Sequence, residues 1–249
     1  MKKSKILCVA LLFTIMASAQ NYKHSLQGVE WVKIESSANV IVKTHSGNEL
    51  LIEGGERHVI PEQAKGLKLV GEEVKDNTEV GFYVIKEGNS LIVKNLKKGN
   101  SAKILLPASQ NFSVTTNWNG HITIAGFKSE IEATAKLNGS IDIKDISGPL
   151  TANSLNGKIN VRFAQVSQES PITIFSTNGT LDIGLQESTL ADLSLSTTNG
   201  SIYTDFELKM PEKDGLKPIA TKRIKAKINN GGVNIQLKTT NGIIYLRKQ

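Results

Sequence analysis

Cysteine is almost absent from this sequence of 249 residues, and its single copy is Cys8. Cys8 lies inside an apolar run, Ile6 to Met16, that follows three lysines and precedes small residues at 17–19. This order is typical of a secretory signal peptide, so we expect residues 1–19 to be removed. The remaining chain then has no cysteine. Disulfides and thiolate chemistry are excluded, and stability must come from the core and the backbone hydrogen bonds.

Long apolar runs are also lacking. The run of 11 residues at 6–16 is shorter than the roughly 20 that a transmembrane helix needs. We therefore expect an exported protein with no membrane-spanning segment after cleavage, located in the periplasm, on the cell surface or outside the cell. Because residues 1–19 hold three of the 30 basic side chains and none of the 23 acidic ones, the rest has a net charge of +4. Export and this charge balance both argue against nucleic acid as a partner.

Catalytic motifs are the third absence. The sequence has no Gly-x-Ser-x-Gly elbow, no Gly-rich phosphate loop and no His-Glu-x-x-His helix, and His24, His45, His58 and His121 show no ligand spacing. We therefore predict no enzyme activity, no cofactor and no metal. The alternative is a polysaccharide lyase or hydrolase that uses Asp142, Asp182 and Arg223.

What the sequence does contain is a repeat. The pair Asn-Gly recurs, and its first five copies are spaced by 19, 18, 22 and 21 residues. Each copy precedes a short segment with alternating apolar residues, such as Ile159 and Val161. A period of two places the apolar side chains on a buried face and the residues between them on an exposed face. The predicted structural turns are Asn119-Gly120, Asn138-Gly139, Asn156-Gly157, Asn178-Gly179, Asn199-Gly200 and Asn241-Gly242.

Two all-β architectures fit these turns. Asn-Gly is a strong signal for a hairpin, which would give an antiparallel β-sandwich or roll. It also suits a corner of a β-solenoid, since both residue types tolerate left-handed backbone. The near-constant spacing of about 20 residues favours the solenoid, with successive coils paired in parallel. Stacked asparagines would then form a ladder of amide hydrogen bonds.

The repeat occupies residues 111–249, and we interpret residues 20–110 as less regular N-terminal coils and a cap, continuous with the repeat as one domain. Loops are expected at 53–79 and 206–220. Trp118 precedes a turn asparagine, and apolar Leu137 and Leu155 take the equivalent positions. This pattern favours packing of Trp118 over a platform for sugar stacking.

The exposed positions supply the candidate binding surface. Asp142 and Asp182 occupy the same place in their units, two coils apart, with Asn160 between them. Calcium needs six to eight oxygens, more than this pair offers. Near the C-terminus, three cations share one face of a strand. They would attract anionic glycans or lipids, or they would form a charged edge that prevents pairing with other chains. The candidates are Asp142, Asn160, Asp182, Tyr203, Arg223, Lys225 and Lys227.

The sequence resembles the putative adhesin family of bacterial envelope proteins, a domain of unknown function. The resemblance rests on the Asn-Gly-x-Ile-x-Val units, the segment from Gly231 to Leu246 and Lys103-Ile-Leu-Leu-Pro107. The resemblance covers about Trp31 to Lys248. It implies a right-handed parallel β-helix in an exported bacterial protein, often from the Bacteroidetes, and it carries over no catalytic residues.

The sequence thus favours an exported, non-catalytic, adhesin-like β-solenoid that acts as a binding or structural module. Its possible partners are an envelope glycan, lipopolysaccharide or an envelope protein. Besides the lyase or hydrolase, an accessory role in envelope signalling stays open, and the sequence leaves the oligomeric state undetermined.

Overall fold

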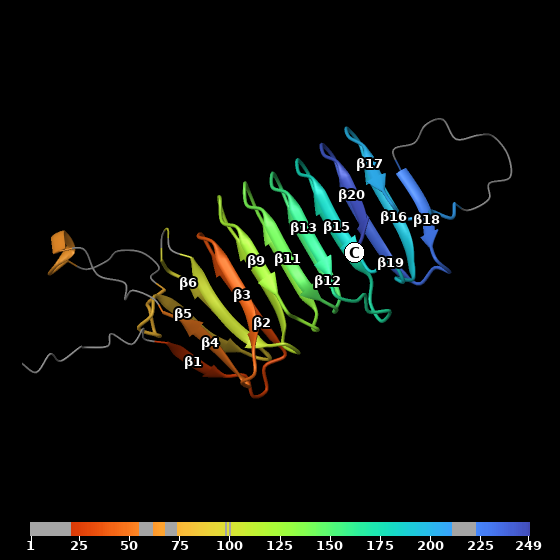
Figure 1. Ribbon diagram of the computed structural model, residues 1–249. Helices are drawn as coiled ribbons and strands as arrows, with labels where there is room; N and C mark the ends of the chain where they lie inside the picture. The colour runs from red at the N-terminus through yellow and green to blue at the C-terminus, as the bar shows by residue number, and fades with distance from the viewer. Residues whose placement is uncertain (1–20, 55–61, 68–73, 98, 100, 211–222) are drawn as a thin grey trace, which may run out of the picture.

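The computed structural model describes residues 21–54, 62–67, 74–97, 99, 101–210 and 223–249. The predicted signal peptide lies outside these residues, as do parts of the two predicted loops. The protein is an elongated stack of strands in two ten-stranded sheets (Figure 1). Within the described ranges, the only helix is the short η1 (Glu62–Ala64), and no helix is long and apolar enough to cross a membrane.

Both sheets run along the length of the stack. Across sheet A the order is β1 (Tyr22–Ser25), β4 (Glu49–Glu53), β7 (Ala102–Pro107), β3 (Val40–His45), β9 (Ile122–Ala125), β11 (Ile141–Ile146), β13 (Ile159–Phe163), β15 (Leu181–Leu185), β20 (Ile244–Lys248) and β17 (Ile202–Thr204). Across sheet B it is β18 (Arg223–Ile228), β16 (Ala191–Thr197), β19 (Val233–Thr239), β14 (Ile172–Ser176), β12 (Leu150–Ser154), β10 (Ile131–Ala135), β8 (Asn111–Thr116), β2 (Trp31–Ser36), β6 (Ser90–Asn95) and β5 (Phe82–Glu87).

Each Asn-Gly corner joins a strand of sheet B to a strand of sheet A, and the two strands form one rung. Asn138-Gly139, for example, lies between β10 and β11. Neighbouring rungs pair in parallel, as β11 does with β9 and β13. The hairpin interpretation of these corners, and with it the antiparallel sandwich, is therefore wrong, and the arrangement is that of a β-solenoid. Antiparallel pairs occur at the two ends, where β4 pairs with β1 and β7, β5 with β6, and β18 with β16.

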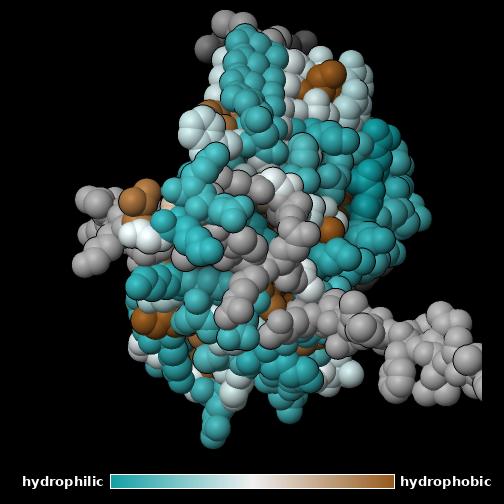
Figure 2. Space-filling view, turned by 90° about the vertical axis from the view of Figure 1, so that its left-hand side faces the viewer, coloured by the Kyte–Doolittle hydropathy of each residue, from teal (hydrophilic) through white to brown (hydrophobic). Residues whose placement is uncertain are grey.

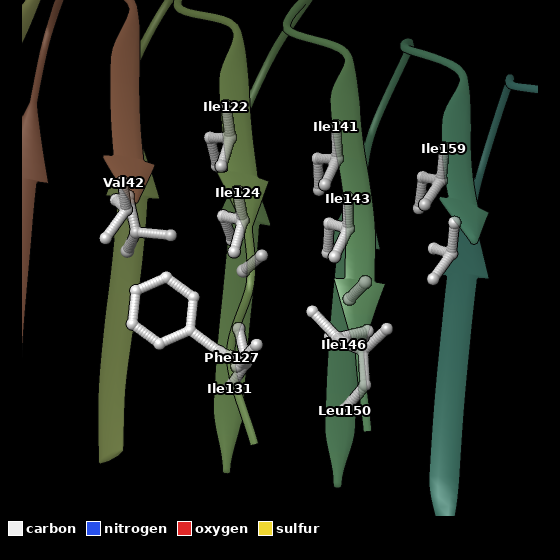
Figure 3. Packing of buried hydrophobic residues seen from close by; sticks show 14 of the residues in the cluster. Val42, Ile122, Ile124, Phe127, Ile131, Ile141, Ile143, Ile146, Leu150 and Ile159 are labelled. Atoms are coloured by element: carbon white, nitrogen blue, oxygen red, sulfur yellow. The ribbon is translucent and has the colours of Figure 1, made fainter. Parts of the chain in front are cut away.

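The core lies between the sheets and is built of columns of matching side chains. Ile122, Ile141 and Ile159 are fully buried and follow one another from rung to rung (Figure 3). Phe127 fills the space at a rung end, with its ring 4.7 Å from that of Phe112. Burying one such side chain stabilises the fold by about 1.5–3 kcal/mol. The predicted inward and outward positions are confirmed in these strands.

The order of the rungs differs from the expected succession at both ends. The rung β2–β3 lies between β6–β7 and β8–β9, and the rung β19–β20 lies between β14–β15 and β16–β17. The expectation that each rung stacks on the one before it in sequence is therefore wrong there. Because every rung presents the same kind of apolar face, rungs distant in sequence fit together as well as consecutive ones.

The predicted asparagine ladder is confirmed. On one edge of the stack, the Nδ2 of five of the six corner asparagines donates a hydrogen bond to the Oδ1 of the next asparagine at 2.6–3.0 Å. The side chains are exposed, so the ladder forms the outer surface of the corners. In spatial order it comprises Asn119, Asn138, Asn156, Asn178, Asn241 and Asn199.

The corner glycines serve a different purpose from the predicted one. None of the six has a φ in the left-handed region, so these glycines do not make the corner by left-handed backbone. A Cβ at Gly157 would instead lie 1.9 Å from the carbonyl oxygen of Gly139 in the next rung, and a Cβ at Gly179 would lie 2.0 Å from that of Gly157. Glycine is required because the corners stack backbone against backbone.

A second ladder, which the sequence analysis missed, lies beneath the asparagines. At the rung of β14, buried Ser176 donates its hydroxyl to the carbonyl oxygen of Gly157 at 3.2 Å. These hydroxyls satisfy corner carbonyls that are shielded from water. Ser154, Thr239 and Thr197 make equivalent bonds to the glycine of a neighbouring rung, whereas Thr116 donates to Gly120 in its own corner.

The edge strand β5 is covered by the residues that precede it. The Nδ2 of Asn77 donates to the carbonyl of Val84 at 2.7 Å, and the Oδ1 of Asn77 accepts from the amide of Val84 at 2.9 Å. One side chain thus takes the place of a neighbouring strand and blocks further pairing. This end of the stack faces the viewer in Figure 2 and is mainly hydrophilic, with hydrophobic residues visible only as small separate areas.

Candidate functional site

A row of outward side chains crosses the C-terminal half of sheet A, one from each rung. We call it the outer row. Parallel pairing aligns its members directly, so neighbours are about 4.8 Å apart. This confirms the predicted order, with Asn160 between Asp142 and Asp182. The outer row consists of Thr123, Asp142, Asn160, Asp182, Tyr245 and Tyr203.

The acidic members of the outer row are already bound by neighbouring side chains. Asn160 donates from Nδ2 to the Oδ1 of Asp142 at 2.6 Å. Asp182 accepts from Arg162 Nη2 at 3.0 Å and from Arg247 Nε at 2.9 Å. The hydrogen bond and the charge of Asp182 raise the pKa of Arg247 above its usual value. Among the described residues, no group of three or more His, Cys, Asp or Glu side chains is placed to hold a metal ion.

Arg162 and Arg247 are the residues of this site that the sequence analysis did not select. Arg162 follows Asn160 by two positions, and Arg247 follows Tyr245 by two, so the period of two places both on the outer face of the sheet. That signal predicts a shared face. It does not predict that both guanidinium groups meet one carboxylate, because this depends on the insertion of β20 next to β15.

Two tyrosines end the outer row. The rings of Tyr203 and Tyr245 are stacked, with centroids 5.6 Å apart and an angle of 18° between planes. The guanidinium of Arg247 lies over Tyr245, 4.9 Å from the ring centre. Tyr203 is 55 % exposed, which leaves much of its surface open to solvent. The two tyrosines are adjacent only because the rung β19–β20 enters the stack beside β17.

The predicted basic residues lie elsewhere. Arg223, Lys225 and Lys227 point outward from β18, the edge strand of sheet B. The structure thus separates the seven candidate residues into two groups, four on sheet A and three on sheet B. The packing predicted for Trp118 is wrong, since its side chain is 68 % exposed at a corner of the stack. The equivalent Leu137 and Leu155 are exposed as well, at 36 % and 39 %, and the backbone of Trp118 has a left-handed φ of 60°.

Two solved structures are similar to this chain. One is a putative cell adhesion protein from Clostridium sporogenes, at 9 % identity, with a TM-score of 0.40 and coverage of 92 % of this chain and 99 % of that one. The other is a putative adhesin from Bacteroides fragilis, at 12 % identity, with a TM-score of 0.35 and coverage of 92 % and 96 %. No curated protein matches the sequence. A family model matches residues 32–247, so the chain belongs to the Toastrack DUF4097 family, a domain of unknown function.

Proposed function

We propose that this protein is an exported, non-catalytic, adhesin-like module of the cell envelope that binds a glycan on the outer row of sheet A. The observation that carries the proposal is the stack of exposed Tyr203 on half-buried Tyr245, beside the ion pair of Asp182 and Arg247. Aromatic faces offer apolar contact at low entropic cost, and the charged groups beside them supply directional hydrogen bonds. Sugars need this combination, because they present both C–H faces and hydroxyls.

The rigid setting of the site supports binding. Tyr245 and Asp182 lie on paired strands, and Asp182 is fixed by two guanidinium groups. Side chains held in this way lose little conformational freedom when a ligand binds. The repeat also presents the row at fixed intervals, which suits an extended ligand made of repeated units. Envelope polysaccharide and the sugar portion of lipopolysaccharide are the candidate sources.

The proposal includes the finer features expected from the sequence. Residues 1–19 are cleaved on export, residues 20–110 form N-terminal coils and a cap continuous with the repeat of residues 111–249, and the coil is right-handed. The mature protein then acts in the periplasm, on the cell surface or outside the cell. N-terminal sequencing of the exported protein tests the cleavage site, and an experimental electron-density map tests the handedness.

A glycan-array screen of residues 20–249, with and without calcium, is the first test. We expect binding to a defined set of envelope glycans that weakens about tenfold in Tyr203→Ala and in Tyr245→Ala. Tyr83→Ala is the matched control. Tyr83 lies on β5, which belongs to the other sheet and to the N-terminal end of the stack. Binding that is equal in all three variants, or that occurs only to envelope proteins, contradicts the proposed site.

The lyase or hydrolase alternative gains no support from the outer row. Such chemistry needs a carboxylate that is available to take or give a proton. Asp182 is shared by two arginines, and Asp142 accepts a short hydrogen bond from Asn160. Depolymerisation of an acidic glycan that is lost in Asp182→Asn would favour the enzyme over the binding module.

A further inference from the structure

A pocket of about 450 Å³ lies on the outer face of sheet B, at its C-terminal edge. Its floor is formed by outward side chains of β16, β18 and β19, and residues 209–210 form one wall. Two backbone hydrogen bonds between Lys209 and Lys227, of 2.8 and 2.9 Å, fix this wall against β18. The pocket is on the opposite sheet from the outer row, so it is independent of the glycan site proposed above.

Three lysines line the pocket and concentrate positive charge there. Lys209 and Lys227 are directly opposite each other in an isolated antiparallel bridge, and Lys225 lies on the same face of β18 as Lys227. Like charges placed opposite each other destabilise a sheet. Among the described residues that line the pocket, Asp192 is the one acidic side chain, and its Oδ1 is 3.7 Å from the Nζ of Lys227. These described side chains carry a net charge of +2, which an anion would offset.

Asp192 supplies a second observation, because its ion pair with Lys227 leaves the carboxylate short of hydrogen-bond donors. Its Oδ1 is buried and accepts no hydrogen bond from any described residue. A buried oxygen of this kind costs free energy unless a donor reaches it. Ser194, Asn234 and Gln236 also line the pocket and offer further donors and acceptors. The groups around the lysines thus suit hydroxyls, which can donate to Asp192 and accept from the amides.

We propose that this pocket binds a phosphorylated sugar. A phosphate monoester carries about −1.5 to −2 charges at neutral pH, which matches the net charge of the pocket. Lysine binds phosphate as a point charge without a fixed geometry, so the three ammonium groups suit this part of the ligand. The sugar hydroxyls would donate to the exposed part of the Asp192 carboxylate, whose negative charge would repel a bare phosphate ion. The same chemistry is available from a free sugar phosphate or from a phosphorylated sugar at the end of an envelope lipid.

Calorimetric titration of residues 20–249 tests the proposal, with glucose 6-phosphate, glucose and inorganic phosphate as probes. Glucose 6-phosphate is expected to bind at least fivefold more tightly than inorganic phosphate, and glucose is expected not to bind. Lys209→Gln and Lys225→Gln should each weaken the binding of glucose 6-phosphate about tenfold. Lys144→Gln, on the exposed face of β11, changes the net charge equally and should have no effect. Titration of vesicles that contain a phosphorylated glycolipid then distinguishes the lipid source from the free one.

Two further measurements keep the result interpretable. Lys209→Gln removes like-charge repulsion, so its melting temperature should be at least that of the wild type, which separates lost binding from unfolding. Asp192→Asn should tighten the binding of inorganic phosphate and reduce the preference for glucose 6-phosphate. Equal binding of both probes in the wild type, or a preference unchanged in Asp192→Asn, overturns the proposal. Tyr203→Ala should leave glucose 6-phosphate binding intact, so failure here and failure of the outer row are distinguishable.

Discussion

The middle of the stack and its two ends are built by different means. Where two strands between β8 and β15 pair with each other, the paired residues are 17–22 positions apart, and the rungs follow the order of the sequence. At the ends, Trp31 pairs with Ser90 and Ile172 with Ile235, which are 59 and 63 residues apart. The middle therefore depends on a short-range repeat, whereas the ends depend on segments that meet only when distant parts of the chain are in place.

The two rungs that break the order of the sequence lie in the interior of the stack. β2–β3 and β19–β20 each have a rung on both sides, whereas antiparallel strands close the stack. The open edge of a parallel coil would recruit other chains, and a closing strand that runs the other way gives a distinct end. The stability of each end should therefore rest on the inserted rung.

Removal of that rung should have the largest effect. Truncation after Gly232 deletes β19 and β20 and takes from β16 and β17 their parallel partners. We expect residues 191–204 to lose protection from amide hydrogen exchange, while β9 to β13 keep theirs. Persistent protection of β16 would show that it pairs directly with β14, as a simple coil would have it, and the contrast between middle and end would then fail.

A charge in the middle of the core comes next. Ile159→Asp places a carboxylate at a fully buried position between Ile141 and Leu181 and should lower the free energy of unfolding by several kcal/mol. The adjacent Asn160→Ala should cost under about 1 kcal/mol, since Asn160 is only part-buried and loses one hydrogen bond. Urea unfolding of both variants provides the comparison, and similar losses would refute the inward and outward assignment.

The glycines of the two regions should respond differently to substitution. Gly157→Ala forces a Cβ against a backbone carbonyl and should cost roughly 2–4 kcal/mol, as overpacking does. Gly88, in the turn between β5 and β6, has a φ of 58° and open space around it, so Gly88→Ala should cost only about 1 kcal/mol.

Substitution by asparagine distinguishes a glycine that is required for left-handed backbone from one that is required for lack of space. It tolerates left-handed backbone, so Gly88→Asn should recover most of the stability lost in Gly88→Ala. Gly157→Asn should be no better than Gly157→Ala, because the obstruction is steric. Thermal unfolding of the four variants is sufficient, and recovery by asparagine at Gly157 would restore the left-handed turn that the sequence first suggested.

Most of the middle was predictable from the sequence. Alternation of apolar residues identifies the strands and their buried faces, and the even spacing of Asn-Gly identifies the corners and the asparagine ladder. The positions of β2–β3 and β19–β20 were not predictable in this way, because the apolar faces of all rungs are alike and do not encode an order.

The candidate site likewise has one part that the sequence predicts and another that it does not. The order of Asp142, Asn160 and Asp182 follows from the repeat and was predicted. The stacking of Tyr203 on Tyr245, and the second arginine at Asp182, depend on the inserted rung and could not be read from spacing. Trp118 was misjudged because an apolar residue beside a corner was assumed to pack, whereas the corner turns it into solvent.

The buried hydroxyl ladder offers a smaller and sharper test of the middle region. Ser176→Ala leaves the carbonyl of Gly157 without this donor and should cost about 1–2 kcal/mol. Asn178→Ala removes two exposed hydrogen bonds that water can replace, so it should cost less than about 1 kcal/mol. Chemical denaturation of the two variants shows which ladder contributes more to the free energy of unfolding. A larger loss in Asn178→Ala would mean that the outer ladder, and not the buried one, holds the corners.

The smallest expected effect concerns pH at the N-terminal end. Burial raises the pKa of Asp76, but hydrogen bonds from Thr78, Gly81 and Glu79 outweigh it and hold that pKa below 3.8. A lowered pKa in the folded state means that Asp76 stabilises the turn before β5 above pH 3.8 and ceases to do so as the pH falls through the lower folded value. Protection factors for the Val84 amide, which bonds to Asn77, should therefore fall below pH 3.8 while those of β11 persist. Asp76→Asn should lack this step, and an identical acid transition in both proteins would show that the turn is held by Asn77 and Thr78 alone.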